Sequence, residues 1–204
     1  MIRSFPVLLL ACASALAASA AAPAGAADLP PDAQRFNADS AAPLANIVSE
    51  FRLGASANVF YTRDREDDVF VNPEVLFASP FPEHTNLFWD ELLRPRPHVG
   101  GTIATDGGTN EAYAGLTWDF SLTHGLFFET SFGGTWHDGK LSQPWYDHGN
   151  ELGCRVLFRE TAGIGYRVGR HWDVLASIDH ASDASLCDKN SGLTHAGLAV
   201  GYRF

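Results

Sequence analysis

Residues 111–120 read Glu-Ala-Tyr-Ala-Gly-Leu-Thr-Trp-Asp-Phe, and this stretch decides the fold. One set of alternate positions is apolar throughout: Ala112, Ala114, Leu116, Trp118 and Phe120. The positions between them are mostly polar and include Glu111, Thr117 and Asp119. Because neighbouring side chains in a strand point to opposite faces, this alternation predicts a β-strand with one apolar face and one polar face.

The same alternation returns along the chain, in segments bounded by Gly, Pro, Asp or Asn, and no helical period holds for long. We count eight such segments, at 48–60, 67–79, 96–106, 110–122, 125–137, 153–168, 172–182 and 193–204. An even number of strands, each of about ten residues or more, is typical of a closed antiparallel membrane barrel. Residues 47–204 are therefore predicted to form an all-β, eight-stranded antiparallel outer-membrane β-barrel.

The pattern also predicts which face of each strand meets lipid. In segment 125–137, the outward residues would be Leu126, Phe128, Phe132 and Trp136, and the inward residues would include Glu129 and Ser131. In the first segment, Phe51 and Leu53 would face outward, opposite Arg52 and Ser56. Side chains can fill the interior of an eight-stranded barrel, so a wide pore is not expected.

A soluble β-sandwich, such as an adhesin, would also alternate, and two features favour the membrane barrel over it. Aromatic residues collect near the strand ends, as they do at membrane interfaces. The chain also finishes Val200-Gly-Tyr-Arg-Phe204, and a terminal Phe after an aromatic strand is typical of outer-membrane barrels.

The amino-acid composition of the chain argues against some classes of function and fold. Of the 204 residues, 46% are hydrophobic and 12% aromatic, and 14 Lys and Arg face 24 Asp and Glu for a formal charge of -10. A nucleic-acid partner is not expected, because phosphate binding favours the opposite sign. The 19 Gly and 11 Pro also disfavour a helical bundle.

The first 26 residues resemble a secretory signal peptide, with an apolar run followed by small residues up to Ala26. Lipidation at Cys12 and a membrane-anchoring helix are the alternatives. Residues 27–46, rich in Pro, Ala and Asp, are predicted to be a flexible N-terminal arm. Export would leave Cys154 and Cys187, which are expected to pair in an oxidising compartment.

Candidate chemistry lies at the end of segment 172–182. Its even-numbered face is apolar at Trp172, Val174, Ala176 and Ile178, and then continues with His180 and Ser182. Residues i and i+2 share a face about 7 Å apart at the base, so an imidazole can reach a neighbouring hydroxyl. A His base beside a Ser nucleophile is the core of an acyl-transfer site, although a strand end at the polar interface would also explain the pair.

A carboxylate partner for His180 follows from the expected strand pairing. If Gly169-Arg-His171 is the turn, the numbers of paired residues sum to 340, which places Glu160 opposite His180. Directly paired residues have Cβ atoms about 5 Å apart. An ion pair of Glu160 with Arg155 or Arg159 is the alternative, and Asp179 is a weaker candidate because it would face the lumen.

Three short motifs then resemble a known family. They are Phe158-Arg-Glu160, His180-Ala-Ser182-Asp-Ala184 and Asn190-Ser-Gly192, followed by the terminal Gly-Tyr-Arg-Phe. Together they resemble the lipid A 3-O-deacylases (PagL-type, acyloxyacyl hydrolase-like), most densely from Gly153 to Phe204. The resemblance implies a bacterial outer-membrane serine esterase that removes the acyl chain ester-linked at position 3 of lipid A. It implies lipid A or lipopolysaccharide and outer-membrane lipids as partners, and no metal or other cofactor.

By the same resemblance, Ser182 is the nucleophile, His180 is the base and Glu160 occupies a carboxylate position. Two residues depart from the family pattern: Asp183 follows the serine where the family usually has Asn, and Thr194 stands where well-known members carry an orienting Glu. Asn190 is a further candidate for site support. The alternative function is a catalytically weak or inactive barrel with a structural or lipid-binding role.

Overall fold

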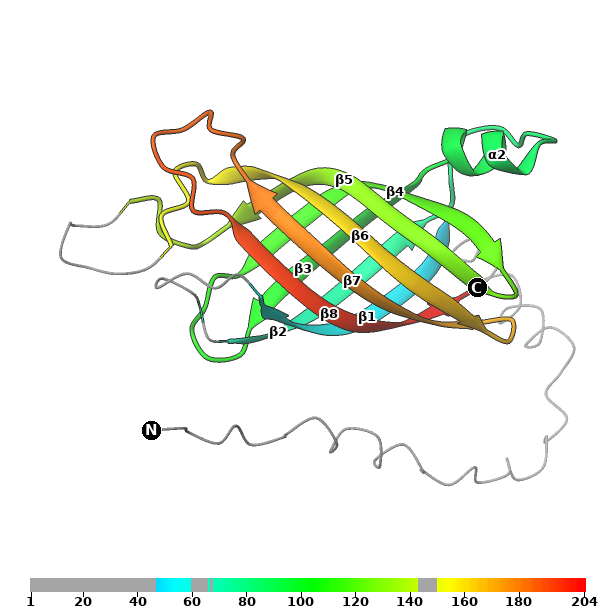
Figure 1. Cartoon of the computed structure of the whole chain (residues 1–204), viewed down its shortest axis with the longest axis horizontal. Coiled ribbons are helices and arrows are strands. Elements are labelled where there is room, and N and C mark those ends of the chain that lie inside the picture. The colour runs from blue at the N-terminus through cyan, green and yellow to red at the C-terminus, as the bar shows by residue number, and fades with distance from the viewer. Residues whose placement is uncertain (1–46, 60–65, 67, 143–149) are drawn as a thin grey trace, which may run out of the picture. The chain divides into compact units, whose positions relative to one another are not determined.

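The computed structural model describes residues 47–59, 66, 68–142 and 150–204. The predicted signal peptide and N-terminal arm lie outside these residues. The described chain forms a closed barrel of eight antiparallel strands with one short helix (Figure 1). The elements are β1 (Val48–Asn58), β2 (Val69–Phe77), α2 (Leu87–Leu93), β3 (Arg96–Ala104), β4 (Glu111–Thr123), β5 (Leu126–His137), β6 (Val156–Val168), β7 (Trp172–Ser182) and β8 (Leu193–Arg203).

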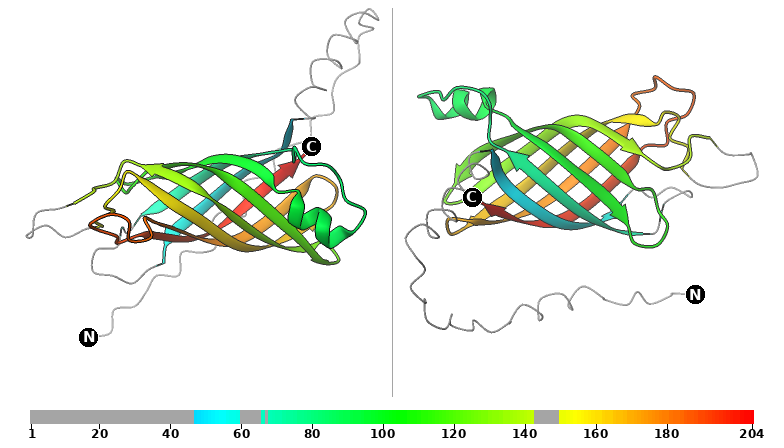
Figure 2. Two further views of the ribbon diagram at one scale, coloured as in Figure 1. Left: turned by 90° about the horizontal axis from the view of Figure 1, so that it is seen from above. Right: turned by 180° about the vertical axis from the view of Figure 1, so that it is seen from behind.

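Each strand pairs with its neighbours in sequence, and β8 returns to β1, with Glu50 opposite Arg203 and Asn58 opposite His195. The views from above and from behind show the same continuous wall (Figure 2). A closed sheet has no unpaired edge, so every strand finds backbone partners on both sides. The predicted all-β, eight-stranded architecture is confirmed. Within the described residues, no helix has the length and apolarity needed to cross a membrane.

The predicted faces of the strands are also confirmed. Outward residues such as Leu53, Phe132 and Trp136 are exposed on the barrel surface. Glu111 and Glu129, at the alternate positions, are buried inside. The outer surface of the wall is therefore apolar and the lumen is polar, as membrane barrels require.

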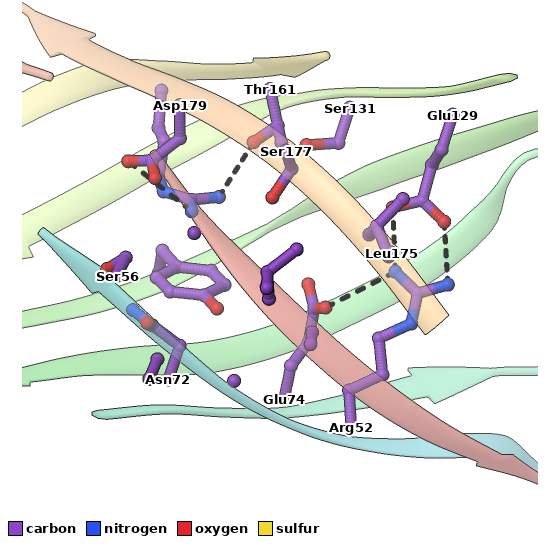
Figure 3. Close-up of a pocket in the computed structure, with 17 residues that line it drawn as sticks. Arg52, Ser56, Asn72, Glu74, Glu129, Ser131, Thr161, Leu175, Ser177 and Asp179 are labelled. Atoms are coloured by element: carbon purple, nitrogen blue, oxygen red, sulfur yellow. Dashed lines mark hydrogen bonds and ion pairs between the residues drawn. The ribbon is translucent and has the colours of Figure 1, made fainter. Parts of the chain in front are cut away.

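Ion pairs fill much of the lumen (Figure 3). The Arg52 guanidinium contacts Glu50, lies 2.6 Å from Glu129 and lies 3.6 Å from Glu74. Arg96 bridges Glu50 at 2.7 Å and Asp119 at 2.6 Å. These residues come from five strands, β1 to β5, so the buried charges connect opposite parts of the wall.

The two ends of the barrel differ in their connections. Short turns, residues 124–125 and 169–171, join β4 to β5 and β6 to β7 at one end. The β2–β3 connection, residues 78–95 with α2, lies at this same end. The other end carries the β1–β2, β3–β4, β5–β6 and β7–β8 connections, the last of them at residues 183–192. Ser182 is the last residue of β7 and thus lies at the end opposite the two short turns.

Two details differ from the sequence prediction. Strand β6 begins at Val156 rather than at residue 153, so Cys154 precedes the strand. Helix α2 was not anticipated, because its seven residues are too few to show a helical period. Its N-cap residue Asn86 accepts a hydrogen bond from the Trp89 N–H, and Trp118 on β4 donates its indole N–H to the Leu92 carbonyl.

Candidate active site

A groove on the outer surface of the barrel contains both residues of the predicted His-Ser pair. On β7, Asp179 and Ala181 are buried on the inner face, whereas His180 and Ser182 are half-buried on the outer face. The structure therefore places both polar groups on the lipid side of the strand. The residues that line the groove come from β5, β6, β7 and the following loop: Phe132, Phe158, Glu160, His180, Ser182 and Ala184.

The imidazole of His180 is held from the side of β8. Its Nδ1 lies 2.8 Å from the hydroxyl oxygen of Thr194, which is the residue directly paired with it. Gly192 packs against the other edge of the ring, and a Cβ added there would lie 3.1 Å from His180 Cε1. Gly192 also has a φ of +66°, a conformation that side-chain-bearing residues rarely adopt. Among the described residues, His180 Nε2 has no hydrogen-bond partner, so it remains available to the groove.

Ser182 shares its face of β7 with His180, but the structure contains no hydrogen bond between them. The two residues are i and i+2 on one strand and line the same groove. Free active sites often hold such a pair farther apart than the reacting complex does. A change in the Ser182 rotamer changes the distance from its hydroxyl to the imidazole without moving the backbone.

Glu160 lies where the expected register puts it. It pairs directly with His180, and Phe158 pairs with Ser182. The alternative ion pairs with arginine are wrong: Arg155 donates to the carbonyl oxygens of His137 and Gly139, and Arg159 lies in the lumen 3.6 Å from Asp179. Glu160 forms no hydrogen bond with His180, and its exposed carboxylate faces the groove.

The backbone turns sharply directly after Ser182. Ala184 and Ser185 have φ values of 54° and 64°, in the left-handed region that costs free energy for residues other than glycine. Asp183 stabilises this turn, because its carboxylate accepts the Ser185 N–H at 2.7 Å. Its own N–H donates to the Asn190 side chain at 3.3 Å, so Asn190 supports the turn as well. The Ala184 N–H, by contrast, makes no hydrogen bond within the described chain.

The loop after β7 is fastened to the residues that precede β6. The structure contains a disulfide between Cys154 and Cys187, whose Cα atoms lie 5.9 Å apart. Lys189 forms an ion pair with Glu151 at 3.0 Å, and the Ser191 N–H donates to the Glu151 carbonyl at 2.9 Å. These contacts restrain both ends of the segment between Ser182 and Thr194.

Replacing both cysteines with serine is expected to lower the free energy of unfolding by about 3–4 kcal/mol, because the bond closes a loop of 33 residues in the unfolded chain. Urea titration with gel mobility as the readout of barrel folding measures the change. The single variants Cys154→Ser and Cys187→Ser serve as controls and should each reproduce the full loss. Unchanged stability in the double variant would contradict the prediction.

Four residues that line or support this site were not assigned a site role from the sequence. Phe132 and Phe158 line the groove with rings stacked at a centroid distance of 6.2 Å. Ala184 contributes an unpaired N–H, and Gly192 contacts the imidazole. The outward position of both Phe residues was readable from the alternation, but the backbone angles of residues 184 and 192 were not.

A family model described as lipid A 3-O-deacylase (PagL) matches residues 84–203. The crystal structure of the outer membrane enzyme PagL aligns with a TM-score of 0.58 at 14% identity, covering 76% of this chain and 100% of that one. The N-terminal β-barrel domain of Pseudomonas aeruginosa OprF aligns with a TM-score of 0.48 at 13% identity, covering 78% and 99%. No curated protein sequence gives a significant match.

Proposed function

Because the chain belongs to the lipid A 3-O-deacylase (PagL) family and is an outer-membrane β-barrel, we propose that it is a serine esterase that removes the acyl chain ester-linked at position 3 of lipid A. One observation carries the proposal: His180 and Ser182 lie together in a groove on the lipid-facing side of β7. In bacterial outer-membrane barrels the short turns are periplasmic, which places the opposite end, with Ser182, at the extracellular side. The groove then opens into the outer leaflet, which is where lipid A resides.

In the proposed reaction, the Ser182 hydroxyl oxygen attacks the ester carbonyl carbon while His180 Nε2 accepts its proton. The resulting tetrahedral intermediate breaks the bond to the sugar oxygen. His180 returns the proton to that oxygen, which leaves as the sugar hydroxyl, and the acyl group stays on Ser182. Water, deprotonated by His180, then hydrolyses the acyl-enzyme to the free fatty acid and regenerates the serine.

Thr194 orients the His180 imidazole and Glu160 stabilises its charged form, two tasks that a single carboxylate often performs. In the tautomer that the proposal requires, Nδ1–H donates to the Thr194 hydroxyl, which orients the ring and leaves Nε2 for the serine. Glu160, directly across the strand pair, places a negative charge beside the groove where the imidazolium forms. This charge stabilises the protonated base without a direct hydrogen bond.

The backbone of the turn after Ser182 replaces the amide side chain that the family usually has at residue 183. The unpaired Ala184 N–H is adjacent to the groove and is our candidate donor to the oxyanion. Asp183 and Asn190 position it by holding the turn. The stacked rings of Phe132 and Phe158 provide apolar surface for the acyl chain.

The direct test incubates the purified protein in detergent with lipid A and compares it with the Ser182→Ala variant by mass spectrometry. The proposal predicts that only the wild type releases one ester-linked chain as free fatty acid. If the lipid A masses are the same for both proteins, the alternative holds, in which Asp183 and Thr194 mark an inactive barrel with a structural or lipid-binding role.

Replacing Thr194 with Val is expected to lower kcat about tenfold with little change in KM, because one hydrogen bond to the imidazole is lost. Thr194→Ser keeps the hydroxyl and should restore the wild-type rate. The measurement is fatty-acid release at varied lipid A concentration. Equal rates for Thr194→Val and Thr194→Ser would show that the hydroxyl does not position His180.

A further inference from the structure

A second cluster of polar side chains lies inside the barrel and plays no part in the proposed reaction. Glu111 on β4, Asp179 on β7 and His195 on β8 are 5%, 7% and 1% exposed. His195 Nδ1 forms a hydrogen bond of 3.4 Å with a carboxylate oxygen of Asp179 and lies 3.8 Å from Oε1 of Glu111. The three ligand atoms all lie within 4.8 Å of one another. Asp179 also borders the lumen cavity shown in Figure 3.

One oxygen in this cluster has no hydrogen-bond donor. Glu111 Oε1 is buried and unpartnered, and it points toward His195. The other carboxylate oxygen accepts a hydrogen bond from the Thr135 hydroxyl at 3.0 Å, which fixes its orientation. A buried carboxylate oxygen without a donor is costly, so the arrangement calls for a cation or a donor that the side chains do not supply.

The charge balance of the cluster favours a cation. Arg159 lies 3.6 Å from Asp179, but no Arg or Lys of the described residues forms an ion pair with Glu111. With a neutral imidazole, the two carboxylates and the Arg159 guanidinium leave one net negative charge in this cluster. Burial makes this charge harder to screen than it would be on the surface.

We propose that Glu111, Asp179 and His195 bind a divalent transition-metal ion, and that Zn²⁺ is the ion that these ligands suit best. One imidazole nitrogen and two carboxylate oxygens are a suitable donor set for zinc. Neighbouring ligands of a tetrahedral ion with bonds of about 2.1 Å are about 3.4 Å apart. The two separations from His195 Nδ1, 3.4 and 3.8 Å, are close to that value, and the two carboxylate oxygens lie within 4.8 Å of each other.

The surroundings support the three side chains as ligands. The ring of Phe70 packs on the His195 imidazole with centroids 4.5 Å apart, and Thr135 holds Glu111. Such partners keep ligands in place around an ion. A bound ion would tie β4, β7 and β8 together beneath the strand end that carries His180, which directly follows Asp179. This inference does not depend on the proposed esterase activity.

The test uses the untagged, full-length barrel refolded in detergent, stripped with EDTA and titrated with Zn²⁺ alone by calorimetry. We expect about one Zn²⁺ per chain, and a rise in the urea midpoint of unfolding when zinc is present. His195→Gln and Glu111→Gln should weaken zinc affinity by at least about tenfold. His98→Gln is the matched control, since His98 is also a buried lumen histidine but bonds to Thr117.

Three outcomes decide the proposal. Lost binding in His195→Gln and Glu111→Gln, with retained binding in His98→Gln, supports it. Equal zinc affinity in the wild type and His195→Gln overturns it, because the ion would then sit elsewhere. Absence of zinc binding by the folded wild type also overturns it. Gel mobility confirms in each case that the barrel is folded, and Co²⁺ spectra of the wild type and His195→Gln give a second readout.

Discussion

Replacing Ser182 with Ala is expected to reduce lipid A deacylation by about 10⁴-fold or more, while leaving the barrel folded. The reason is that the hydroxyl is the attacking group in the proposed reaction, and the methyl group that remains cannot form the acyl-enzyme. The assay is fatty-acid release from lipid A by purified protein, supported by mass spectrometry of lipid A from cells that express each variant.

Ser177→Ala is the matched control for this variant. Ser177 lies on the same strand, β7, but on the lumen side, where it borders the cavity and not the groove. It should keep the wild-type rate. Residual deacylation of more than a few per cent in Ser182→Ala, with the same product, would assign the nucleophile to another residue.

The largest effect on stability is expected for Arg52→Met. This change leaves Glu50 and Glu129 buried without their main cation, and breaking one side of a buried ion pair costs about 3–5 kcal/mol. The measurement is the urea midpoint of barrel unfolding. Arg170→Met, in the exposed β6–β7 turn, controls for the loss of a guanidinium and should have little effect.

A double variant distinguishes the stability lost through the unpaired charge from the stability lost through poorer packing. Arg52→Met combined with Glu129→Gln removes one carboxylate along with the guanidinium, so it should recover part of the lost stability. If the double variant is no more stable than Arg52→Met, the destabilisation arises from packing rather than from the unpaired, buried negative charge of Glu129.

The register around the site could be predicted because it depends on short-range information. The two-residue alternation assigned the outer face of β7, and a three-residue turn at 169–171 determined which residue of β6 meets His180. Both rules are local, so one sequence was sufficient. The same locality explains why the limits of most strands were predicted to within a few residues.

The features that could not be predicted depend on contacts between distant strands or on backbone angles. Alternation showed that Arg52 points inward, but its pairing with Glu129 crosses the lumen, 77 residues along the chain. The hydrogen bond between Thr194 and His180 depends on the χ angles of two side chains. The left-handed turn at Ala184 and Ser185 contains no glycine, so the sequence did not indicate it.

The position of the groove on the wall governs how molecules reach it. Ser182 and His180 open toward lipid and not toward the lumen. Lipid molecules therefore reach the groove by lateral diffusion within the leaflet, in two dimensions, rather than from bulk water. The fraction of grooves that hold a lipid is accordingly determined by the mole fraction of that lipid in the membrane or micelle surface. Adding inert detergent lowers this mole fraction, and with it the occupancy of the groove, even when the total lipid concentration is constant.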